Sequence, residues 1–514
     1  MIEENHRHDL REGDVVTEAQ SVLAALDDSA LSRFHFKALL TSGMGFFTDA
    51  YDLFIIGVAL AILKPLWQLN SLEVSLLGST SLIAAAFGAL IFGRLADHIG
   101  RRAIYGHTLI VLAIGAIASA LSPNIIWLLI FRFILGLGIG GDYPLSATLM
   151  SEYANRSDRG KLITMVFSMQ GIGLIVGPLV AIILLVAGIN HDLTWRIMLA
   201  LGAVPALGTF YLRRQIAETP RFALSMQGDV AGAARTVDMV KHGPNSRGLS
   251  GAHIASAQSV SISSAPASGV QPFTTLKTDA APRKFQPAKS WLYLLLTRRY
   301  LPWIIGTAGA WFLLDIAYYG TTISSTLVLN ALNPKADLIT NMFYTLIIFV
   351  VAALPGYILA AFTIDRLGRK RIQWIGFGMM TLAYGSLAVA PVLSTITLTF
   401  LLIYGLSYFF TEFGPNVTTF VYPAEIFPVM VRTTAHGIAA ALGKVGAFIG
   451  AFAFPYLLIN FHLPGAMAFA AITSLAGLLL TILTLPEPNQ RSLEEISDEH
   501  KVKSAHQERM VVLQ

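Results

Sequence analysis

Twelve apolar segments, each long enough to cross a lipid bilayer, recur along the chain. One crossing by a helix needs roughly 17–25 predominantly apolar residues. Helices are the expected spanning element, because lipid offers no partner to unpaired backbone groups and these runs exceed the length of barrel strands. We therefore predict an all-α integral membrane protein. The predicted spans are 37–62, 75–96, 103–122, 124–147, 163–188, 194–212, 301–327, 339–364, 372–391, 394–421, 433–459 and 463–485.

The composition agrees with a chain that is mostly surrounded by lipid. Only 13% of the 514 residues are charged and 54% are hydrophobic, whereas soluble domains carry about 25% charged residues. The sequence contains no cysteine, which excludes disulfides, thiolate nucleophiles and cysteine-ligated metals. Its twelve histidines have no metal-binding spacing, and it contains no nucleophile–base motif or cofactor loop. We expect no metal, no cofactor and no enzymatic activity.

The basic residues are unevenly distributed. Of the 36 Lys and Arg residues, Arg132 and Lys444 fall inside predicted spans, and most others lie in the termini, the alternate loops and the gap 213–300. Cytoplasmic loops of membrane proteins are enriched in Lys and Arg. We therefore predict a multi-pass protein of the plasma or inner membrane with both termini in the cytoplasm. The basic loops are then surface that faces water or lipid head groups, so nucleic-acid binding is not expected.

The spans divide into two groups of six, at 37–212 and 301–486. The first group carries GRLADHIGRR at 93–102 between its second and third spans, and the second carries FTIDRLGRK at 362–370 in the same place. Two pseudo-symmetric six-helix halves with a site between them resemble the architecture of the major facilitator superfamily. The remaining segments are a cytoplasmic N-terminal segment at 1–36, a partly disordered cytoplasmic linker at 213–300 and a cytoplasmic tail at 487–514.

Each half repeats a charged loop of the pattern D-x-x-G-R-[RK], which resembles the signature loop of that superfamily. A carboxylate beside clustered cations at a helix end can latch the two halves in one state. The alternative is a basic anchor at the membrane surface without a gating role. The candidate gating residues are Asp97, Arg101, Arg102, Arg132, Glu152, Arg159, Asp365, Arg369, Glu425 and Arg432.

Arg132 lies in the middle of a span, where a charge is costly and needs a partner. Gly136 and Gly140 follow it at four-residue intervals, and small residues at this spacing permit the close approach of a neighbouring helix. We expect the arginine to pair with one of three carboxylates: Asp142, Glu152 or Asp97.

Several carboxylates also lie within predicted spans. Ionisable groups inside a membrane are rare, and they commonly form proton relays. The alternative is a structural ion pair with Arg132 or Lys444. The residues concerned are Asp49, Asp52, Asp142, Asp315 and Glu412.

Trp311, Asp315 and Tyr319 are spaced four residues apart in the seventh span. This spacing places an indole N–H, a carboxylate and a phenol on one helix face. Such a stripe suits a polyoxygen anion that bears its own protons, whereas Trp and Tyr alone are typical of the membrane interface. Lys444 offers a counter-charge to an anionic substrate or to Asp315.

Gln170 and Asn416 add amide donors to the fifth and tenth spans. An amide in such a position either contacts a substrate or only joins neighbouring helices.

Four strings in the sequence resemble the phosphate:proton symporter family, the branch of the superfamily that contains the fungal and plant high-affinity phosphate transporters. They are GGDYPLSATLMSEYANRSDRGKL, FSMQGIG, WFLLDIAYYG and FGPNVTTFVYPAEIFPVMVR. The resemblance implies secondary active import of inorganic phosphate by proton symport through alternating access. It implies phosphate contacts at Tyr143, Gln170, Trp311, Asp315, Tyr319 and Asn416, with Lys444 exchanging partners with Asp315. It implies a proton route through Asp49, Asp52, Asp142 and Asp315.

Three positions depart from the pattern of that family. The linker at 223–290 carries no string typical of the family, and Gly320-Thr321-Thr322 follows the stripe where eukaryotic members have a different triplet. Glu412 is acidic where a neutral residue is expected, which bears on the number of protons transported. The alternatives are a proton symporter for another small anion, an organic acid or a sugar, a nutrient sensor, or a membrane enzyme, because fold alone does not fix substrate.

Overall fold

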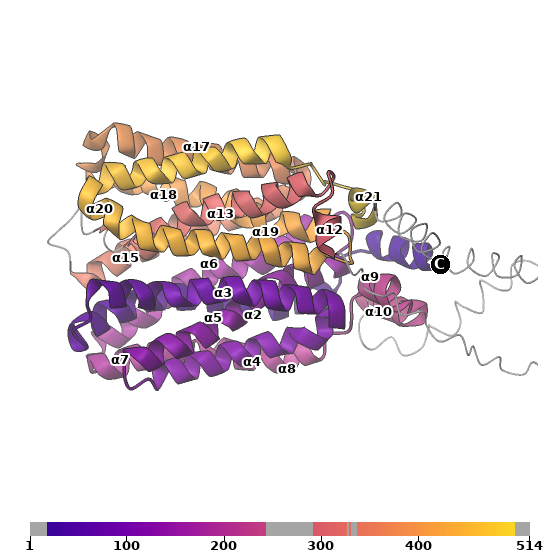
Figure 1. The fold of residues 1–514 in the computed structure, drawn as a ribbon, viewed down its shortest axis with the longest axis horizontal. Coiled ribbons are helices and arrows are strands. Elements are labelled where there is room, and N and C mark those ends of the chain that lie inside the picture. The colour runs from indigo at the N-terminus through magenta and orange to yellow at the C-terminus, as the bar shows by residue number, and fades with distance from the viewer. Residues whose placement is uncertain (1–17, 243–290, 326–327, 330–336, 499–514) are drawn as a thin grey trace, which may run out of the picture.

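The computed structural model describes residues 18–242, 291–325, 328–329 and 337–498, and the described residues form helices and no strand (Figure 1). Seven helices make up the first half of the bundle. They are α2 (Arg33–Leu66), α3 (Ser71–Ile99), α4 (Arg101–Ala120), α5 (Ile125–Tyr153), α6 (Arg159–Val186), α7 (His191–Leu201) and α8 (Ala203–Arg214).

The second half of the bundle contains more broken helices and one long one, α20. They are α13 (Leu301–Ile323), α15 (Leu338–Ile348), η2 (Phe349–Ala353), α16 (Leu354–Leu367), α17 (Arg369–Val389), η3 (Pro391–Ser394), α18 (Thr397–Phe413), α19 (Pro415–Ile426) and α20 (Arg432–Thr484).

Short helices gather at one end of both halves, on the right in Figure 1, and we call this the short-helix end. They are α9 (Pro220–Phe222), η1 (Ala223–Gln227), α10 (Val230–His242), α12 (Trp291–Leu295) and α21 (Leu493–Ser497).

Ten helical stretches in the described part of the chain are long and apolar enough to cross a membrane, where α7–α8 (His191–Arg214) counts as one stretch and α15–η2–α16 (Ile339–Leu367) counts as another. One of them, α20, contains two crossings, because its backbone leaves the helical conformation at His462 (φ 57°). Its two arms run antiparallel in Figure 1. A further crossing is made by α18 and α19 together. With the arms of α20 counted separately and α18–α19 counted as one broken span, the described residues contain the twelve predicted spans.

The break between α18 and α19 has a local cause. Pro415 opens α19 and has no N–H to continue the preceding helix. Gly414 lies so close to Gly376 of α17 that a Cβ on Gly414 would stand 2.5 Å from the Gly376 Cα. Glycine at both positions lets the backbones touch. The break places the side chains of Glu412 and Asn416 on either side of a bend inside the bundle.

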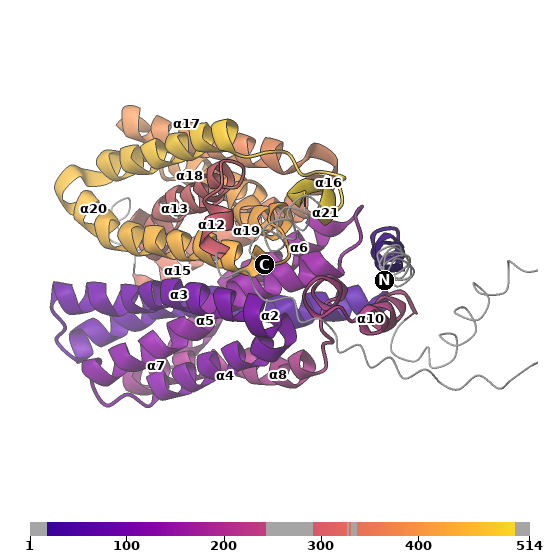
Figure 2. The same cartoon turned by 45° about the vertical axis from the view of Figure 1, so that its right-hand side comes forward.

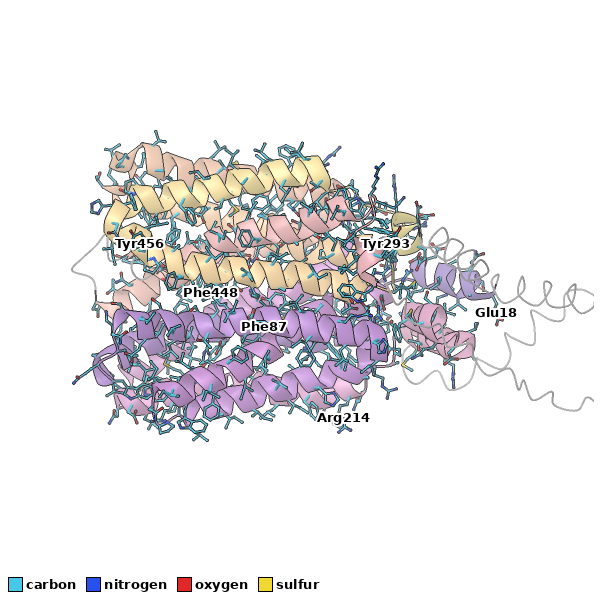
Figure 3. All side chains as sticks on the ribbon, viewed as in Figure 1. Glu18, Phe87, Arg214, Tyr293, Phe448 and Tyr456 are labelled. Atoms are coloured by element: carbon cyan, nitrogen blue, oxygen red, sulfur yellow. The ribbon has the colours of Figure 1, made fainter. Side chains whose placement is uncertain are left out.

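The two halves lie side by side, with α2–α8 below and α13–α20 above in both Figure 1 and Figure 2. Large apolar side chains cover the outside of the long helices, among them Phe87 and Tyr456 in Figure 3. An apolar exterior of this kind suits a surface that contacts lipid. The polar groups described below are buried between the helices.

The segment after the sixth span begins with ordered structure. Arg213, which the sequence analysis assigned to the linker, lies in the last turn of α8 and is buried. Residues 220–242 then form α9, η1 and α10. The middle of the linker, 243–270, which its Ser, Ala and Gly content predicts to be disordered, lies outside the described residues.

Candidate functional site

The centre of the bundle holds Lys444 of α20, which is 1% exposed. Its ammonium group donates to the hydroxyl of Tyr143 on α5 at 2.9 Å and to the hydroxyl of Tyr319 on α13. Tyr143 in turn donates to the carboxylate of Asp49 on α2, which lies 3.9 Å from the Lys444 Nζ. One cation therefore joins four helices from both halves.

Glycines in α20 bring Lys444 into this position. A Cβ on Gly446 or Gly450 would overlap the backbone of α13 at Phe312 or Ile316. On the same side, a Cβ on Gly443 would lie 2.6 Å from the Trp311 ring. The two helices can pack this closely because glycine has no side chain.

Asp315 lies on α13, one helical turn before Tyr319, and is 1% exposed. Its Oδ2 has no hydrogen-bond partner in the described part of the chain. Lys444 pairs with Asp49 in this structure, and the described residues form no ion pair between Lys444 and Asp315. The Trp311 ring lies 5.9 Å from the Tyr143 ring. The predicted stripe therefore faces the interior and leaves one carboxylate oxygen free to accept.

A second polar cluster lies around Asn416 on α19. Its amide nitrogen is within hydrogen-bonding distance of the Glu412 Oε2 (2.5 Å), the Tyr357 hydroxyl (2.9 Å) and the Gln170 Oε1 (3.3 Å). The Tyr357 hydroxyl also donates to the Gln170 Oε1 at 2.8 Å. Tyr357 was not among the predicted residues. Its only signal in the sequence is a phenol in the eighth span, a residue type that is also common at membrane interfaces.

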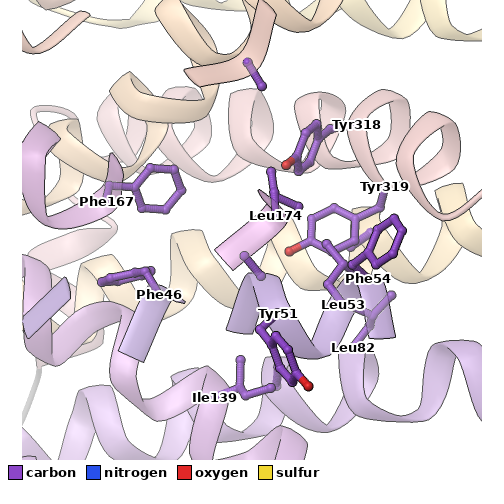
Figure 4. Close-up of a cluster of buried hydrophobic side chains, with 14 of the residues drawn as sticks. Phe46, Tyr51, Leu53, Phe54, Leu82, Ile139, Phe167, Leu174, Tyr318 and Tyr319 are labelled. Atoms are coloured by element: carbon purple, nitrogen blue, oxygen red, sulfur yellow. The ribbon is translucent and has the colours of Figure 1, made fainter. Parts of the chain in front are cut away.

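Aromatic rings separate these two clusters. Phe167 stacks on Phe420 with ring centroids 4.7 Å apart. The Phe167 ring lies 6.3 Å from the Tyr357 ring, and the Phe420 ring lies 6.3 Å from the Tyr143 ring. In Figure 4 the hydroxyl group of Tyr319 points to the side on which Phe46 and Phe167 lie. None of the seven predicted substrate residues is more than 3% exposed. The predicted residues thus form two polar clusters inside the bundle that share an aromatic wall.

The three carboxylates predicted to pair with Arg132 were wrong, whereas the alternative considered for Asp52, an ion pair with Arg132, is what the structure shows. The guanidinium of Arg132 pairs with Asp52 at 2.5 Å and donates to Ser81 at 2.9 Å. Asp142 lies about 15 Å further along the same helix at a rise of 1.5 Å per residue, which is too far for contact. Arg132 also lies away from the other gating candidates. With Asp49, Asp52 and Lys444 it lines a small cavity of about 10 Å³.

Gly136 and Gly140 determine which helix Arg132 faces. A Cβ on either residue would overlap the backbone of α3, at Ser81 or at Ala85. These glycines therefore allow α5 to pack closely on α3, as their four-residue spacing predicts.

Asp142 is held by a residue that the sequence analysis missed. Arg213 contacts both oxygens of the Asp142 carboxylate, one of them at 2.9 Å, and lies over the Tyr105 ring at 4.0 Å. In the sequence, Arg213 looks like one of the basic residues that commonly follow a span. Asp142 therefore belongs to a buried ion pair and not to the cluster around Lys444.

Two aspartates of the repeated loops bridge the halves at the short-helix end. Asp97 of α3 accepts the backbone N–H of Thr433 at 3.3 Å and of Thr434 at 2.6 Å, at the start of α20. Asp365 of α16 accepts the N–H of Gly160 at 3.0 Å and of Lys161 at 2.7 Å, at the start of α6. A carboxylate is favourable at a helix N-terminus. We call these contacts the two latches.

Ion pairs surround the latches. Arg101 pairs with Glu152 at 3.1 Å and Arg369 pairs with Glu425 at 2.7 Å, so corresponding residues of the two halves pair alike. Arg432 adds a bond of 3.0 Å to Glu152 across the interface. These pairs bring most of the gating candidates into two groups at this end, one of Asp97, Arg101, Glu152 and Arg432 and one of Asp365, Arg369 and Glu425.

The two remaining gating candidates lie elsewhere at this end. Arg159 contacts Asp27 at 3.4 Å and the backbone of Arg491. Arg102 is exposed, and its backbone N–H donates to Glu218 at 3.2 Å. Burial raises the pKa of Glu218, although the charge of Arg101 opposes this shift.

Comparison with known proteins places the chain in a family. The profile of the sugar (and other) transporter family matches residues 37–500. Inorganic phosphate transporter 1-11 of Oryza sativa subsp. japonica is 36% identical, with 93% of this chain and 90% of that protein covered. The probable inorganic phosphate transporter 1-6 of Arabidopsis thaliana is 37% identical, with 94% and 97% covered.

Among solved structures, the major facilitator superfamily proton:xylose symporter XylE matches with a TM-score of 0.74 at 21% identity, covering 91% of this chain and 99% of that chain. This likeness confirms the predicted fold. The chain therefore belongs to the sugar (and other) transporter family of the major facilitator superfamily, in the branch formed by the inorganic phosphate transporters.

Proposed function

We propose that this chain is a secondary active transporter that imports inorganic phosphate together with protons by alternating access. The observation that carries the proposal is the buried ammonium group of Lys444, which contacts Tyr143 and Tyr319 across the interface between the halves. Two phenols and an ammonium group supply donors to a tetrahedral oxyanion. The names of the curated relatives support phosphate as that anion.

The charges around the site support proton coupling. Lys444 faces Asp49, while Asp315 and Glu412 lie nearby on α13 and α18. A phosphate anion entering beside several ionised carboxylates is repelled, and charges in a low-dielectric interior interact strongly. Protons that bind to carboxylates remove this repulsion. The proposal therefore requires that protons and phosphate bind together.

Of the four predicted proton-coupling residues, two suit this role best. Asp52 and Asp142 each contact an arginine, which stabilises the ionised carboxylate. Asp49 and Asp315 have no arginine partner in the described structure. We propose that these two carry protons, and that the other two carry protons only if their ion pairs open during the cycle.

Asp315 is proposed to select phosphate over sulfate. At neutral pH phosphate carries at least one O–H group, which Asp315 accepts through its free Oδ2 whether or not its other oxygen carries the coupled proton. Sulfate has no O–H to donate, so it would leave a buried acceptor unpaired at a cost of about 1–3 kcal/mol. This difference corresponds to roughly tenfold to hundredfold weaker binding of sulfate.

The latches are proposed to close the cytoplasmic side. The excess of Lys and Arg in the termini and alternate loops assigns the short-helix end to the cytoplasm of a cell that carries the protein in its plasma or inner membrane. When Asp97 and Asp365 release the starts of α20 and α6, the halves separate at that end and the site opens inward. Phosphate crosses chemically unchanged, so the proposal assigns no enzymatic reaction to the chain.

Uptake into proteoliposomes tests the proposal. The purified chain is reconstituted, a proton gradient is imposed with the outside acidic, and accumulation of labelled phosphate is measured. We expect accumulation that disappears when a protonophore collapses the gradient. Arsenate should compete well, whereas sulfate, organic acids and sugars should compete poorly. Absence of gradient-driven phosphate uptake would overturn the proposal, and equal competition by sulfate would overturn the role of Asp315.

A further inference from the structure

Glu412 is a buried carboxylate that no basic residue in the described part of the chain balances. It is 0% exposed in α18, and a Cβ on Gly356 of α16 would lie 3.1 Å from the Glu412 Cβ, so the two helices touch there. The groups that face its carboxyl in the described structure are neutral: Asn416, Tyr357 and Tyr318. An isolated charge in such surroundings is costly, and a carboxyl group avoids that cost by binding a proton.

The hydrogen bonds around Glu412 are incomplete. The Asn416 amide has two N–H groups but faces three acceptors, on Glu412, Tyr357 and Gln170. The Tyr357 hydroxyl already gives its proton to Gln170. The Glu412 Oε1 and the Tyr318 hydroxyl, which faces Glu412, each lack a hydrogen bond among the described residues. A protonated Glu412 can donate to a neighbouring oxygen such as that of Tyr318 and needs no counter-charge.

We propose that Glu412 binds one additional proton that crosses the membrane with each phosphate. The inference rests on the proposed function and deepens it. In the outward-facing state the carboxylate takes a proton from the outside to form the carboxylic acid. In the inward-facing state the same O–H bond breaks and the proton leaves to the inside, so the residue returns unchanged. One proton moves inward for each phosphate, in addition to those carried by Asp49 and Asp315.

Asn416 couples this proton to the substrate. When its amide turns toward a phosphate oxygen, Glu412 loses the N–H that now reaches it at 2.5 Å. An ionised Glu412 would then lack this hydrogen bond and would repel the phosphate anion. A protonated Glu412 carries no charge and does not repel the anion. Phosphate therefore favours protonation of Glu412, and by thermodynamic reciprocity protonation favours phosphate.

The other titratable groups around Glu412 support the same direction. Asp315 is the one carboxyl group among them, and repulsion between two ionised carboxylates favours a proton on one of the two. The phenols keep their protons near neutral pH and act as neutral donors. The groups that face Glu412 from the packed helices are Asp315, Tyr318 and Tyr319 on α13, Tyr357 on α16 and Tyr384 on α17.

The number of protons per phosphate tests the inference. Proteoliposomes are held at zero membrane potential with a pH difference of one unit. The ratio of internal to external phosphate concentration at which net flux stops is then measured. Each coupled proton multiplies that ratio by about ten. Glu412→Gln has a similar shape and cannot bind the proton, so we expect its ratio to be about tenfold lower than that of the unmodified chain. Asp28→Asn, which removes an exposed carboxylate, should leave the ratio unchanged.

Each outcome separates the inference from the proposed function. If the unmodified chain fails to accumulate phosphate, the proposed function itself fails. If it accumulates phosphate and Glu412→Gln reaches the same ratio, Glu412 carries no coupled proton and only the inference is overturned.

A binding measurement covers the case in which Glu412→Gln no longer transports. Phosphate affinity of the purified protein is measured between pH 5 and 8. The affinity of the unmodified chain should fall more steeply with rising pH, by up to tenfold per pH unit, than that of Glu412→Gln. Equal slopes would contradict the inference. Loss of binding at every pH would also contradict it, because glutamine reproduces the uncharged state that the inference requires.

Discussion

Buried carboxylates within the spans have different charge partners in the two halves of the bundle. In the first half, Asp52 pairs with Arg132 and Asp142 pairs with Arg213, both from the same half. In the second half, the described structure pairs neither Asp315 nor Glu412 with a basic residue. Lys444 of the second half faces Asp49 of the first half. Two carboxylates of the first half, Asp52 and Asp142, therefore have fixed partners, whereas Asp315 and Glu412 of the second half carry charge that protons or substrate must neutralise.

The largest effect on stability is expected from breaking the pair in the first half. Arg132→Met removes the cation and leaves Asp52 buried without its partner, which typically costs about 3–5 kcal/mol. We expect a clear decrease in the apparent Tm, measured by intrinsic fluorescence of the purified protein in detergent.

A second variant distinguishes this charge effect from a packing defect. Asp52→Asn combined with Arg132→Met removes both charges, and replacement of a whole buried pair is often close to neutral. We expect the double variant to recover most of the lost Tm. A double variant as unstable as Arg132→Met would show that the packing of the arginine, and not its charge, stabilises this region.

In the second half, loss of a carboxylate should impair transport more than stability. Asp315→Asn removes a buried negative charge that has no basic partner in the described structure, so the Tm should stay equal or rise. Because a proton site is lost, the phosphate ratio maintained by a one-unit pH gradient should fall about tenfold or more. Proteoliposome accumulation checks the second expectation. A variant that keeps full pH-dependent accumulation would mean that Asp315 carries no coupled proton.

The difference between local spacing and contacts between helices explains which features of the site could be predicted from the sequence alone. The apolar lengths predicted the spans, and the four-residue spacing predicted that Trp311, Asp315 and Tyr319 share an inward face. The resemblance predicted that Lys444 and Asn416 belong to the substrate site, and both residues lie in the interior. Spacing within one helix could reveal these features because they depend on local geometry.

The ion pairs of the first half could not be predicted in this way. Arg132 meets Asp52 because Gly136 and Gly140 pack α5 on α3, which is a contact between helices. Arg213 appeared to be an ordinary basic residue at the end of a span, and only the packing of α8 brings it to Asp142. Partners of a buried charge depend on tertiary packing, which a single sequence does not show.

The two latches allow a matched comparison of the halves at the short-helix end. Asp97 accepts two N–H groups and the Thr434 hydroxyl and is fully buried, whereas Asp365 accepts two N–H groups and is partly exposed. Asparagine at either position weakens these charge-assisted bonds by about 1–2 kcal/mol. We expect both variants to shift the chain toward opening at this end, and Asp97→Asn to shift it further.

Spin-label distances measure this opening. Because the sequence contains no cysteine, Arg214→Cys and Arg371→Cys introduce two specific labels, one in each half, at exposed positions. The population with a longer distance should increase up to about tenfold in Asp97→Asn and less in Asp365→Asn. If both variants keep the distance distribution of the parent, the latches do not control this end.

The smallest effect is expected where corresponding arginines of the halves differ. Arg432 bonds to Glu152 across the interface, whereas Arg159 contacts Asp27 of the N-terminal segment, which also pairs with Arg221 at 2.5 Å. Asp27→Asn removes one charge but leaves Arg221 its contact with Glu494 in the tail. Because asparagine keeps an oxygen that accepts from the arginines, only the charge-assisted part of these buried bonds is lost, and we expect a loss of about 1 kcal/mol, visible as a small decrease in Tm.

The pH dependence of Asp27→Asn sharpens this last expectation. Burial raises the pKa of Glu494, but the charge of Arg221 outweighs burial and holds that pKa at about 2. A lowered carboxylate pKa contributes stability above its unfolded value of 4.5, and this contribution is lost as the pH falls toward 2. Between pH 5 and 8 Glu494 stays ionised, so the Tm difference between Asp27→Asn and its parent should be constant. A difference that grows within that range would mean that Glu494 does not stay ionised there.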